Sequence, residues 1–176
     1  VQLGSYAHSS TNRIYVGYDE LAEPLVQALV ATEDVRFYKH SGVDVRGVGR
    51  AVIKRGVLRN TASGGGSTIT QQLAKQLYSP HAKSTLQRLL QKPIEWVIAI
   101  KLERNYTKEE IIAMYLNQFD FLYNAVGIRS AAQTYFGKKP SELTLTESAM
   151  LVGMCKNPSF YNPVLHADSD APLNRR

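Results

Sequence analysis

Residues 64–77 read GGGSTITQQLAKQL, and within this stretch the chain passes from a glycine-rich loop into a helical pattern. Consecutive glycines favour a loop. Ser67 or Thr68 is of a type preferred at a helix N-cap, and Ser79-Pro80 marks the far end. The apolar residues in between recur on one helical stripe: Ile69, Leu73 and Leu77. The stretch therefore predicts an α-helix that begins directly after a flexible loop.

The other face of this predicted helix is polar. Its residues fall within an arc of ~100° on a helical wheel, and they are Thr68, Gln71, Gln72 and Lys75. A glycine loop that leads into a helix N-terminus presents free backbone N–H groups, which bind anions such as phosphate. The G-x-x-x-x-G-K-[ST] spacing of a P-loop is absent. Two interpretations stay open, an ordinary solvent-facing helix side or an anion-binding site.

Helical spacing continues through most of the chain, and strand-like alternation is scarce. Asp19 is a suitable N-cap for a helix over about 20–38. The core stripe of that helix holds Leu21, Leu25, Ala28, Leu29 and Thr32. Further helices are predicted over about 44–58, 82–104, 107–116, 127–136 and 146–155. Pro93 makes the stretch 82–104 either one kinked helix or two helices that meet near Lys92. The predicted fold class is mainly α.

The composition is that of one globular domain. The chain has 176 residues, 44% hydrophobic and 20% charged, which suffices for a core and is unlike a disordered protein. The single cysteine, Cys155, excludes an intramolecular disulfide and a cysteine-based zinc site, and we expect it to be a small buried hydrophobe. The longest apolar run, residues 96–100, is too short to span a membrane. The net charge of +6 suits a partner that carries phosphate.

Two acidic positions are candidates for chemistry. Glu33-Asp34 lies at the end of an apolar predicted helix, where a carboxylate is suited to general acid–base work, and the alternative is a solvated helix end. Glu95 follows Lys92 by three residues, which predicts an i,i+3 ion pair, and Arg88 shares their arc if the helix is continuous. The histidines form no i,i+4 pair, which argues against a histidine metal site.

Two further surfaces have open interpretations. Arg46, Arg50 and Lys54 share one face of a predicted helix that would lie on an anionic membrane surface or pack on the core by its valine face. The tyrosines and phenylalanines around 115–136 are interpreted first as core residues. The apolar cluster of Phe119, Phe121, Leu122 and Tyr123 lies in a predicted loop, which leaves exposure as the alternative.

Four motifs occur in a fixed order along the chain. Residues 33–42 read E-D-x-x-F-x-x-H-x-G, and residues 65–72 read G-G-S-T-I-T-Q-Q. Residues 92–95 then read K-x-x-E, and residues 108–117 read K-x-x-I-x-x-x-Y-L-N. The likeness to which they belong covers about residues 12–163, nearly the whole chain. This pattern resembles the peptidoglycan glycosyltransferase domain of class A penicillin-binding proteins and monofunctional transglycosylases, glycosyltransferase family 51.

The resemblance implies a lysozyme-like helical domain with a smaller, mobile, membrane-facing lobe at roughly 43–66. It implies polymerisation of lipid II, an undecaprenyl-diphosphate-linked GlcNAc-MurNAc-pentapeptide, by an inverting single displacement that releases undecaprenyl diphosphate. Glu33 matches the catalytic base, and Glu95 matches the second catalytic carboxylate. The substrate-binding positions carried over are Asp34, Phe37, His40, Gly65, Gly66, Ser67, Thr68, Gln71, Gln72, Lys75, Arg88, Lys92 and Asn117.

The resemblance also implies cofactors and partners. A divalent cation, Mg²⁺ or Mn²⁺, would serve as a counter-ion of the diphosphate, with no metal site in the chain and no organic cofactor. The expected partners are lipid II, the growing glycan chain, the membrane surface, moenomycin-type inhibitors and other cell-wall synthesis proteins, without nucleic acid. The expected location is the outer, periplasmic face of the bacterial cytoplasmic membrane. We expect residues 1–176 to be one domain excised from a longer membrane-anchored protein.

The sequence departs from the family pattern in two places. Gln91 stands where the third motif usually has arginine, and Asp120-Phe121-Leu122 replaces a usual Tyr-Phe-Gly. Two alternatives remain beside the family function. One is a lysozyme-like lytic enzyme that cleaves glycan strands, and the other is a non-catalytic module that binds lipid II or nucleic acid.

Overall fold

A computed structural model describes residues 14–56, 66–78, 85–162 and 164–165. Its α-helices are α1 (Glu23–Glu33), α2 (Val45–Gly56), α3 (Ile69–Tyr78), α4 (Thr85–Asn105), α5 (Lys108–Gln118), α6 (Ile128–Phe136) and α7 (Leu145–Lys156). Short 3-10 turns occur at η1 (Tyr18–Glu20), η2 (Phe37–Lys39) and η3 (Pro140–Glu142). Within this part of the chain there is no β-strand, only an isolated bridge between Asp120 and Val126. The predicted mainly α class is confirmed.

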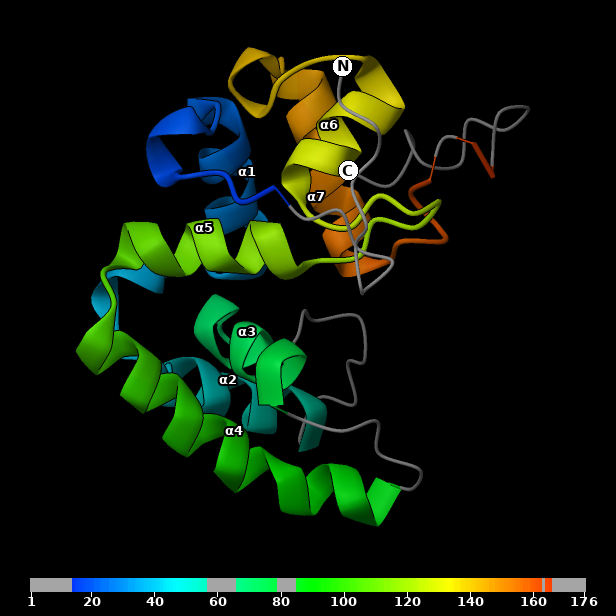
Figure 1. Ribbon diagram of the computed structural model, residues 1–176. Helices are drawn as coiled ribbons and strands as arrows, with labels where there is room; N and C mark the ends of the chain where they lie inside the picture. Colours follow the sequence, from blue (N-terminus) through cyan, green and yellow to red (C-terminus); the bar gives the residue numbers. More distant parts are fainter. Residues whose placement is uncertain (1–13, 57–65, 79–84, 163, 166–176) are drawn as a thin grey trace.

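The helices form two groups on either side of α5 (Figure 1). One group contains α1, α6 and α7, and α1 packs on α7. The other contains α2, α3 and α4, and α3 packs on both α4 and α5. No residue of α5 from Ile111 to its end is exposed, and Ile111, Ile112 and Leu116 are fully buried. A helix that is apolar on most of its surface belongs inside a protein, so α5 forms the centre of the core.

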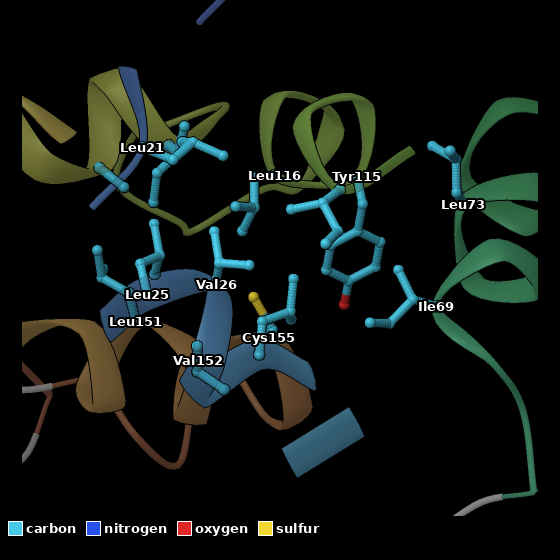
Figure 2. Packing of buried hydrophobic residues seen from close by; sticks show 14 of the residues in the cluster. Leu21, Leu25, Val26, Ile69, Leu73, Tyr115, Leu116, Leu151, Val152 and Cys155 are labelled. Carbon is cyan, nitrogen blue, oxygen red and sulfur yellow. The ribbon is translucent and has the colours of Figure 1, made fainter. Parts of the chain in front are cut away.

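The core fills the space between α5 and its neighbours (Figure 2). Its buried residues from outside α5 include Leu25 and Leu29 of α1, Ile69 and Leu73 of α3, and Leu151 and Val152 of α7. Phe121 is also fully buried, so the core interpretation is confirmed for that residue of the cluster at 119–123. Tyr123 of the same cluster is exposed, which is the alternative.

The first predicted helix is divided into three pieces. Asp19 lies in η1 and is not the N-cap of α1, whose N-cap is Ala22. Helix α1 begins at Glu23, with Pro24 in its first turn, where a residue without a backbone N–H is well suited. The helix ends at Glu33 rather than at about residue 38, because Asp34 leaves the helical conformation with φ −156°. Thr32, expected on the core stripe, is exposed.

The other predicted helices are close to those observed. Thr107 caps α5 and Thr144 caps α7, each in a capping box with a glutamate three residues on. Pro93 lies inside α4, which is a single helix, so the alternative of two helices meeting near Lys92 is wrong. The loop predicted before α3 lies outside the described residues apart from Gly66, and so does the tail from His166.

The proposed membrane-facing lobe is described only in part. Helix α2 has Arg46 and Arg50 exposed, while the side chain of Lys54 and all of residues 57–65 lie outside the described part. Val45 is also exposed, so the valine face does not pack uniformly on the core. Among the helices described, none has the length and apolar character needed to cross a bilayer.

Candidate active site

Glu33 is the last residue of α1, and its carboxylate meets α3. The Nε2 of Gln72 donates a hydrogen bond of 2.8 Å to Glu33 Oε2. The second oxygen, Oε1, is buried and has no hydrogen-bond partner. A buried carboxylate oxygen without a donor is uncommon, and at a functional site it indicates a place for a ligand's hydroxyl group. The interpretation of Glu33 as a carboxylate for acid–base chemistry is therefore favoured over that of a solvated helix end.

Tyr115 of α5 extends this arrangement. Its hydroxyl donates a hydrogen bond of 3.1 Å to Gln72 Oε1. Burial raises the pKa of Tyr115, with smaller contributions from Cys155 and from the negative charge of Glu33, so the hydroxyl keeps its proton. Cys155 is buried as predicted, and its thiol pKa is likewise raised by burial and then by Glu33. This thiol is therefore unsuited to act as a nucleophile.

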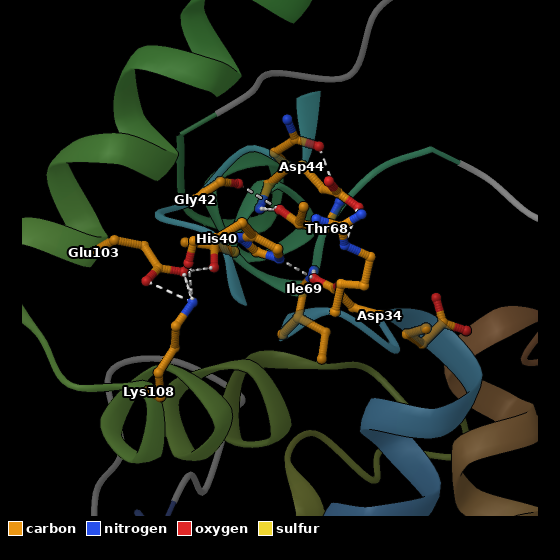
Figure 3. Close-up of polar contacts among 12 residues, drawn as sticks. Asp34, His40, Gly42, Asp44, Thr68, Ile69, Glu103 and Lys108 are labelled. Atoms are coloured by element: carbon orange, nitrogen blue, oxygen red, sulfur yellow. Dashed lines mark hydrogen bonds and ion pairs between the residues drawn. The ribbon is translucent and has the colours of Figure 1, made fainter. Parts of the chain in front are cut away.

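Asp34 is buried beside Glu33, and one of its carboxylate oxygens is bonded within the protein. Its Oδ2 lies 2.9 Å from His40 Nε2 and accepts a hydrogen bond of 3.2 Å from the backbone N–H of Ile69 (Figure 3). Ile69 is the first residue of α3, so the carboxylate occupies the positive end of that helix dipole. Asp34 and His40 thus fasten the segment after α1 to the start of α3.

The start of α3 is closed by a reciprocal pair of hydrogen bonds. Thr68 Oγ1 accepts from the N–H of Gln71 at 3.1 Å, and Gln71 Oε1 accepts from the N–H of Thr68 at 2.9 Å. Both residues are only 2% exposed, so the solvent-facing interpretation of this polar arc is wrong for them. Because the N–H groups of Ile69 and Gln71 already have partners, they are not open to phosphate. The Nε2 of Gln71 is buried without a partner and remains as a donor.

Gly42, in the first motif, is required by close packing. Its carbonyl accepts a hydrogen bond of 2.6 Å from Thr68 Oγ1 (Figure 3). Its φ is +93°, and a Cβ there would lie 2.8 Å from the backbone oxygen of Ala99 in α4. Only glycine meets both conditions without strain.

Lys108 and Glu103 brace this region, and motif reasoning did not assign either a role. Lys108 Nζ lies 2.7 Å from Glu103 Oε2, donates to the carbonyl of His40 at 2.8 Å, and lies 4.2 Å from the centre of the Phe37 ring (Figure 3). Thr70 Oγ1 donates to Glu103 Oε1 at 2.6 Å. Phe37 is fully buried beneath this brace, so its place is structural and not a substrate contact. Lys108 is the first residue of the fourth motif, and this was the only feature of the sequence that could have indicated its role.

Glu95 and Lys92 form the predicted i,i+3 ion pair on α4. Lys92 Nζ lies 2.7 Å from Glu95 Oε2. Glu95 is only 3% exposed, whereas the side chain of Lys92 is 44% exposed. The pair therefore places a buried anion under an accessible cation. The backbone of Arg88 continues α4, but its side chain lies outside the described residues.

The remaining predicted site residues are spread along α3 and α5. Gly66 and Ser67 are half-buried before α3, Lys75 is exposed on it, and Gly65 lies outside the described residues. Asn117 donates to the carbonyls of Val16 at 2.8 Å and Ala113 at 2.7 Å, and it accepts from the N–H of Val16 at 2.9 Å. Both amide protons of Asn117 are used within the protein, so its observed role is to fix the chain at Val16.

The loop that departs from the family pattern is left-handed at successive residues. Leu122 has φ 66°, followed by Tyr123 at 49° and Asn124 at 60°. Leucine adopts this conformation at a cost that glycine does not incur. The left-handed backbone at residue 122 explains why glycine is usual there, and Leu122 adopts the same conformation in this chain. Gln91, the other departure, is half-buried on α4 and makes an interaction of its own.

A dedicated metal cage is not built by the residues described. Among them, no three His, Cys, Asp or Glu side chains lie close enough together to hold an ion. The carboxylates described above are instead committed to Gln72, His40, Lys92 and Lys108.

The chain matches the family model described as Transglycosylase over residues 2–176. It is 44% identical over 159 residues to penicillin-binding protein 1F of Bacillus subtilis (strain 168), covering 90% of this chain and 22% of that protein. It is 42% identical over 161 residues to penicillin-binding protein 1A of Escherichia coli (strain K12), covering 92% of this chain and 18% of that protein. Penicillin-binding protein 1A of Aquifex aeolicus (strain VF5) is 43% identical over 160 residues, with 89% and 21% covered. The chain thus spans about a fifth of the length of these curated relatives.

Proposed function

Because the chain belongs to the transglycosylase family and is a glycosyltransferase domain, we propose that it polymerises lipid II into the β-1,4 glycan strands of peptidoglycan. The observation that carries the proposal is the state of Glu33. One carboxylate oxygen is held by Gln72, and the other is buried and without a partner. This is the arrangement that a general base needs before its substrate binds.

In the proposed reaction, Glu33 Oε1 takes the proton of the 4-hydroxyl of the acceptor GlcNAc. The hydroxyl oxygen then attacks C1 of the donor MurNAc, and the bond from C1 to the diphosphate oxygen breaks with inversion. The electron pair of that bond leaves with undecaprenyl diphosphate. Gln72 supports this step because it engages Oε2 alone and holds the carboxylate in one orientation.

The leaving diphosphate needs positive charge and hydrogen-bond donors rather than a general acid. Lys92 and Lys75 are the accessible cations of the motifs on α4 and α3, and the unpaired Nε2 of Gln71 adds a donor. We assign Glu95 the role of holding Lys92 in place through its 2.7 Å contact. Moenomycin-type inhibitors, which resemble the donor, are proposed to bind near Lys75, Lys92 and Glu95.

A divalent cation in this proposal belongs to the diphosphate. Mg²⁺ typically binds through substrate phosphates and one or two carboxylates rather than a protein cage. When bound, it would neutralise part of the charge on the diphosphate. The protein's own steps, proton removal by Glu33 and orientation by Gln72, are assigned without it.

The proposed location is the outer face of the bacterial cytoplasmic membrane, where the lipid-linked substrate lies. The exposed Arg46 and Arg50 on α2 suit anionic head groups. The growing strand is the proposed donor, and other cell-wall synthesis proteins are the proposed partners.

The decisive experiment compares Glu33→Gln with Glu23→Gln, using labelled lipid II in detergent with Mg²⁺. Both changes remove one carboxylate from α1, but Glu23 is exposed in its first turn. We expect Glu33→Gln to lower kcat by at least about 10³-fold, within the range of general base catalysis, with little change in KM. Glu23→Gln should polymerise like the unaltered domain.

Three results would contradict the proposal. Equal activity of the Glu33→Gln and unaltered domains would remove Glu33 as the base. Cleavage of finished glycan strands without use of lipid II would indicate a lytic enzyme. An unaltered, folded domain that binds lipid II without forming polymer would indicate a binding module.

A further inference from the structure

Three polar side chains, one from each of three helices, form a continuous chain that ends at Glu33. Gln72 of α3 donates to Glu33 at 2.8 Å, and Tyr115 of α5 donates to Gln72 at 3.1 Å. Cys155, from α7, interacts electrostatically with the Tyr115 hydroxyl. Figure 2 shows the ring of Tyr115 pointing from α5 into the core, with Cys155 and Ile69 on either side in this view.

We propose that Tyr115 is a positioning residue, which acts on proton transfer by fixing the orientation of the Gln72 amide. This inference rests on the proposed function and adds a residue to its machinery. Tyr115 is fully buried and does not reach a substrate. Its influence on the reaction therefore passes through Gln72 to Glu33.

The two ends of the Gln72 amide differ in hydrogen bonding. Oxygen accepts hydrogen bonds and nitrogen donates them. Tyr115 donates its proton to Oε1, so Nε2 is turned toward the carboxylate of Glu33. If the amide were reversed, its oxygen would face a carboxylate oxygen, which is repulsive, and the tyrosine proton would lose its acceptor. The hydroxyl of Tyr115 thus favours the one orientation that occupies Oε2 and leaves Oε1 for the acceptor sugar.

The position of the Tyr115 hydroxyl is itself over-determined. The ring is enclosed by the core, and the tyrosine proton is committed to Gln72. Because burial keeps the hydroxyl protonated, Tyr115 remains a donor throughout the working pH range. A hydroxyl that always donates to Gln72 keeps its amide in one orientation, and Glu33 therefore has a constant partner.

The test is Tyr115→Phe, with Tyr135→Phe as the matched control. The Tyr135 hydroxyl also has two partners, donating to the Phe121 carbonyl at 2.6 Å and accepting from Asn162 at 2.9 Å. We expect Tyr115→Phe to lower kcat about tenfold with KM nearly unchanged, because the base is less well oriented. The acidic limb of its pH–rate profile should move to higher pH, because the hydrogen bond that favours the ionised carboxylate is weakened. Tyr135→Phe should move neither quantity.

A double-substitution cycle shows whether Tyr115 acts through Gln72. In a Gln72→Leu background, Tyr115→Phe should cause no further loss of kcat, because the amide that it orients is absent. Additive losses would overturn the proposal. So would an unchanged kcat and pH profile in Tyr115→Phe, or equal losses in Tyr115→Phe and Tyr135→Phe. Thermal unfolding of each variant establishes that it is folded before kinetics are compared.

A measurement without substrate separates this inference from the proposed function. The ¹H–¹⁵N signals of the Gln72 side-chain amide should shift in Tyr115→Phe and stay in place in Tyr135→Phe. If they shift while the unaltered domain makes no polymer, the proposed function fails and the hold of Tyr115 on Gln72 is supported. If they do not shift, the inference is overturned whatever the activity.

Discussion

The two carboxylate regions, at the end of α1 and in the middle of α4, hold their charges in different ways. Glu33 is bonded to a neutral amide, and one of its oxygens has no partner. Glu95 is bonded to an ammonium group, which balances its charge. A carboxylate whose charge is unbalanced and whose oxygen is free is prepared to take a proton, whereas one paired with a cation is prepared to position that cation. This difference supports Glu33 as the base and Glu95 as the residue that holds Lys92 in place.

The largest effect should come from shortening each carboxylate by one methylene. Glu33→Asp keeps the charge but withdraws it from Gln72, and a displacement of this size lowers kcat by about 10²-fold. Glu95→Asp should lower it only about twofold, because the long side chain of Lys92 can follow its partner. Steady-state polymerisation of lipid II measures both. Equal losses of kcat in the two variants would contradict the different roles assigned to Glu33 and Glu95.

The next effect concerns the brace formed by Lys108 and Glu103. Lys108→Met removes the ion pair to Glu103 and the bond to the His40 carbonyl, and it leaves the buried Glu103 without its cation. We expect the free energy of unfolding to fall by about 3 kcal/mol, as when one partner of a largely buried pair is removed. Urea denaturation measures the change. Lys101→Met, an exposed lysine of α4, is the control and should change the midpoint little.

A smaller effect should follow Lys92→Met. Glu95 is then buried without its cation, but solvent already reaches the Lys92 side chain, so we expect a loss of about 1–2 kcal/mol. Adding Glu95→Leu should recover that stability without recovering polymerisation. Recovered polymerisation in the double variant would contradict the role assigned to Lys92 at the diphosphate.

The smallest effect should leave both carboxylate regions unchanged. Leu122→Gly introduces the residue that suits φ 66°, and we expect the free energy of unfolding to rise by about 1 kcal/mol. Gly137→Ala, at the same φ of 66° with open space around its Cβ, should lower it by a similar amount. Denaturation midpoints measure both changes, and a stabilising Gly137→Ala would refute the backbone explanation.

Features set by neighbouring residues could be predicted from the sequence. The caps at Thr68, Thr107 and the pair Lys92–Glu95 all join residues three positions apart, and local pattern suffices for them. The burial of Cys155 followed from its residue type.

Features that join distant segments could not be predicted in this way. Asp34 reaches the N–H of Ile69, and Asn117 reaches Val16 across a separation of 101 residues. Glu103 carries no motif and acquires its role only when α4 meets the first turn of α3. For the same reason the start of α3 resembled an anion site in sequence, although a carboxylate of the protein already fills it.

The central position of α5 has a consequence for folding cooperativity. Its buried residues pack against both groups of helices, so neither group can be completed while α5 is unfolded. Opening of α5 therefore requires opening of the whole described domain, and its backbone amides should exchange with solvent only through global unfolding. The same helix carries Tyr115, so the residue that we propose orients the base lies in the part of the molecule that opens last.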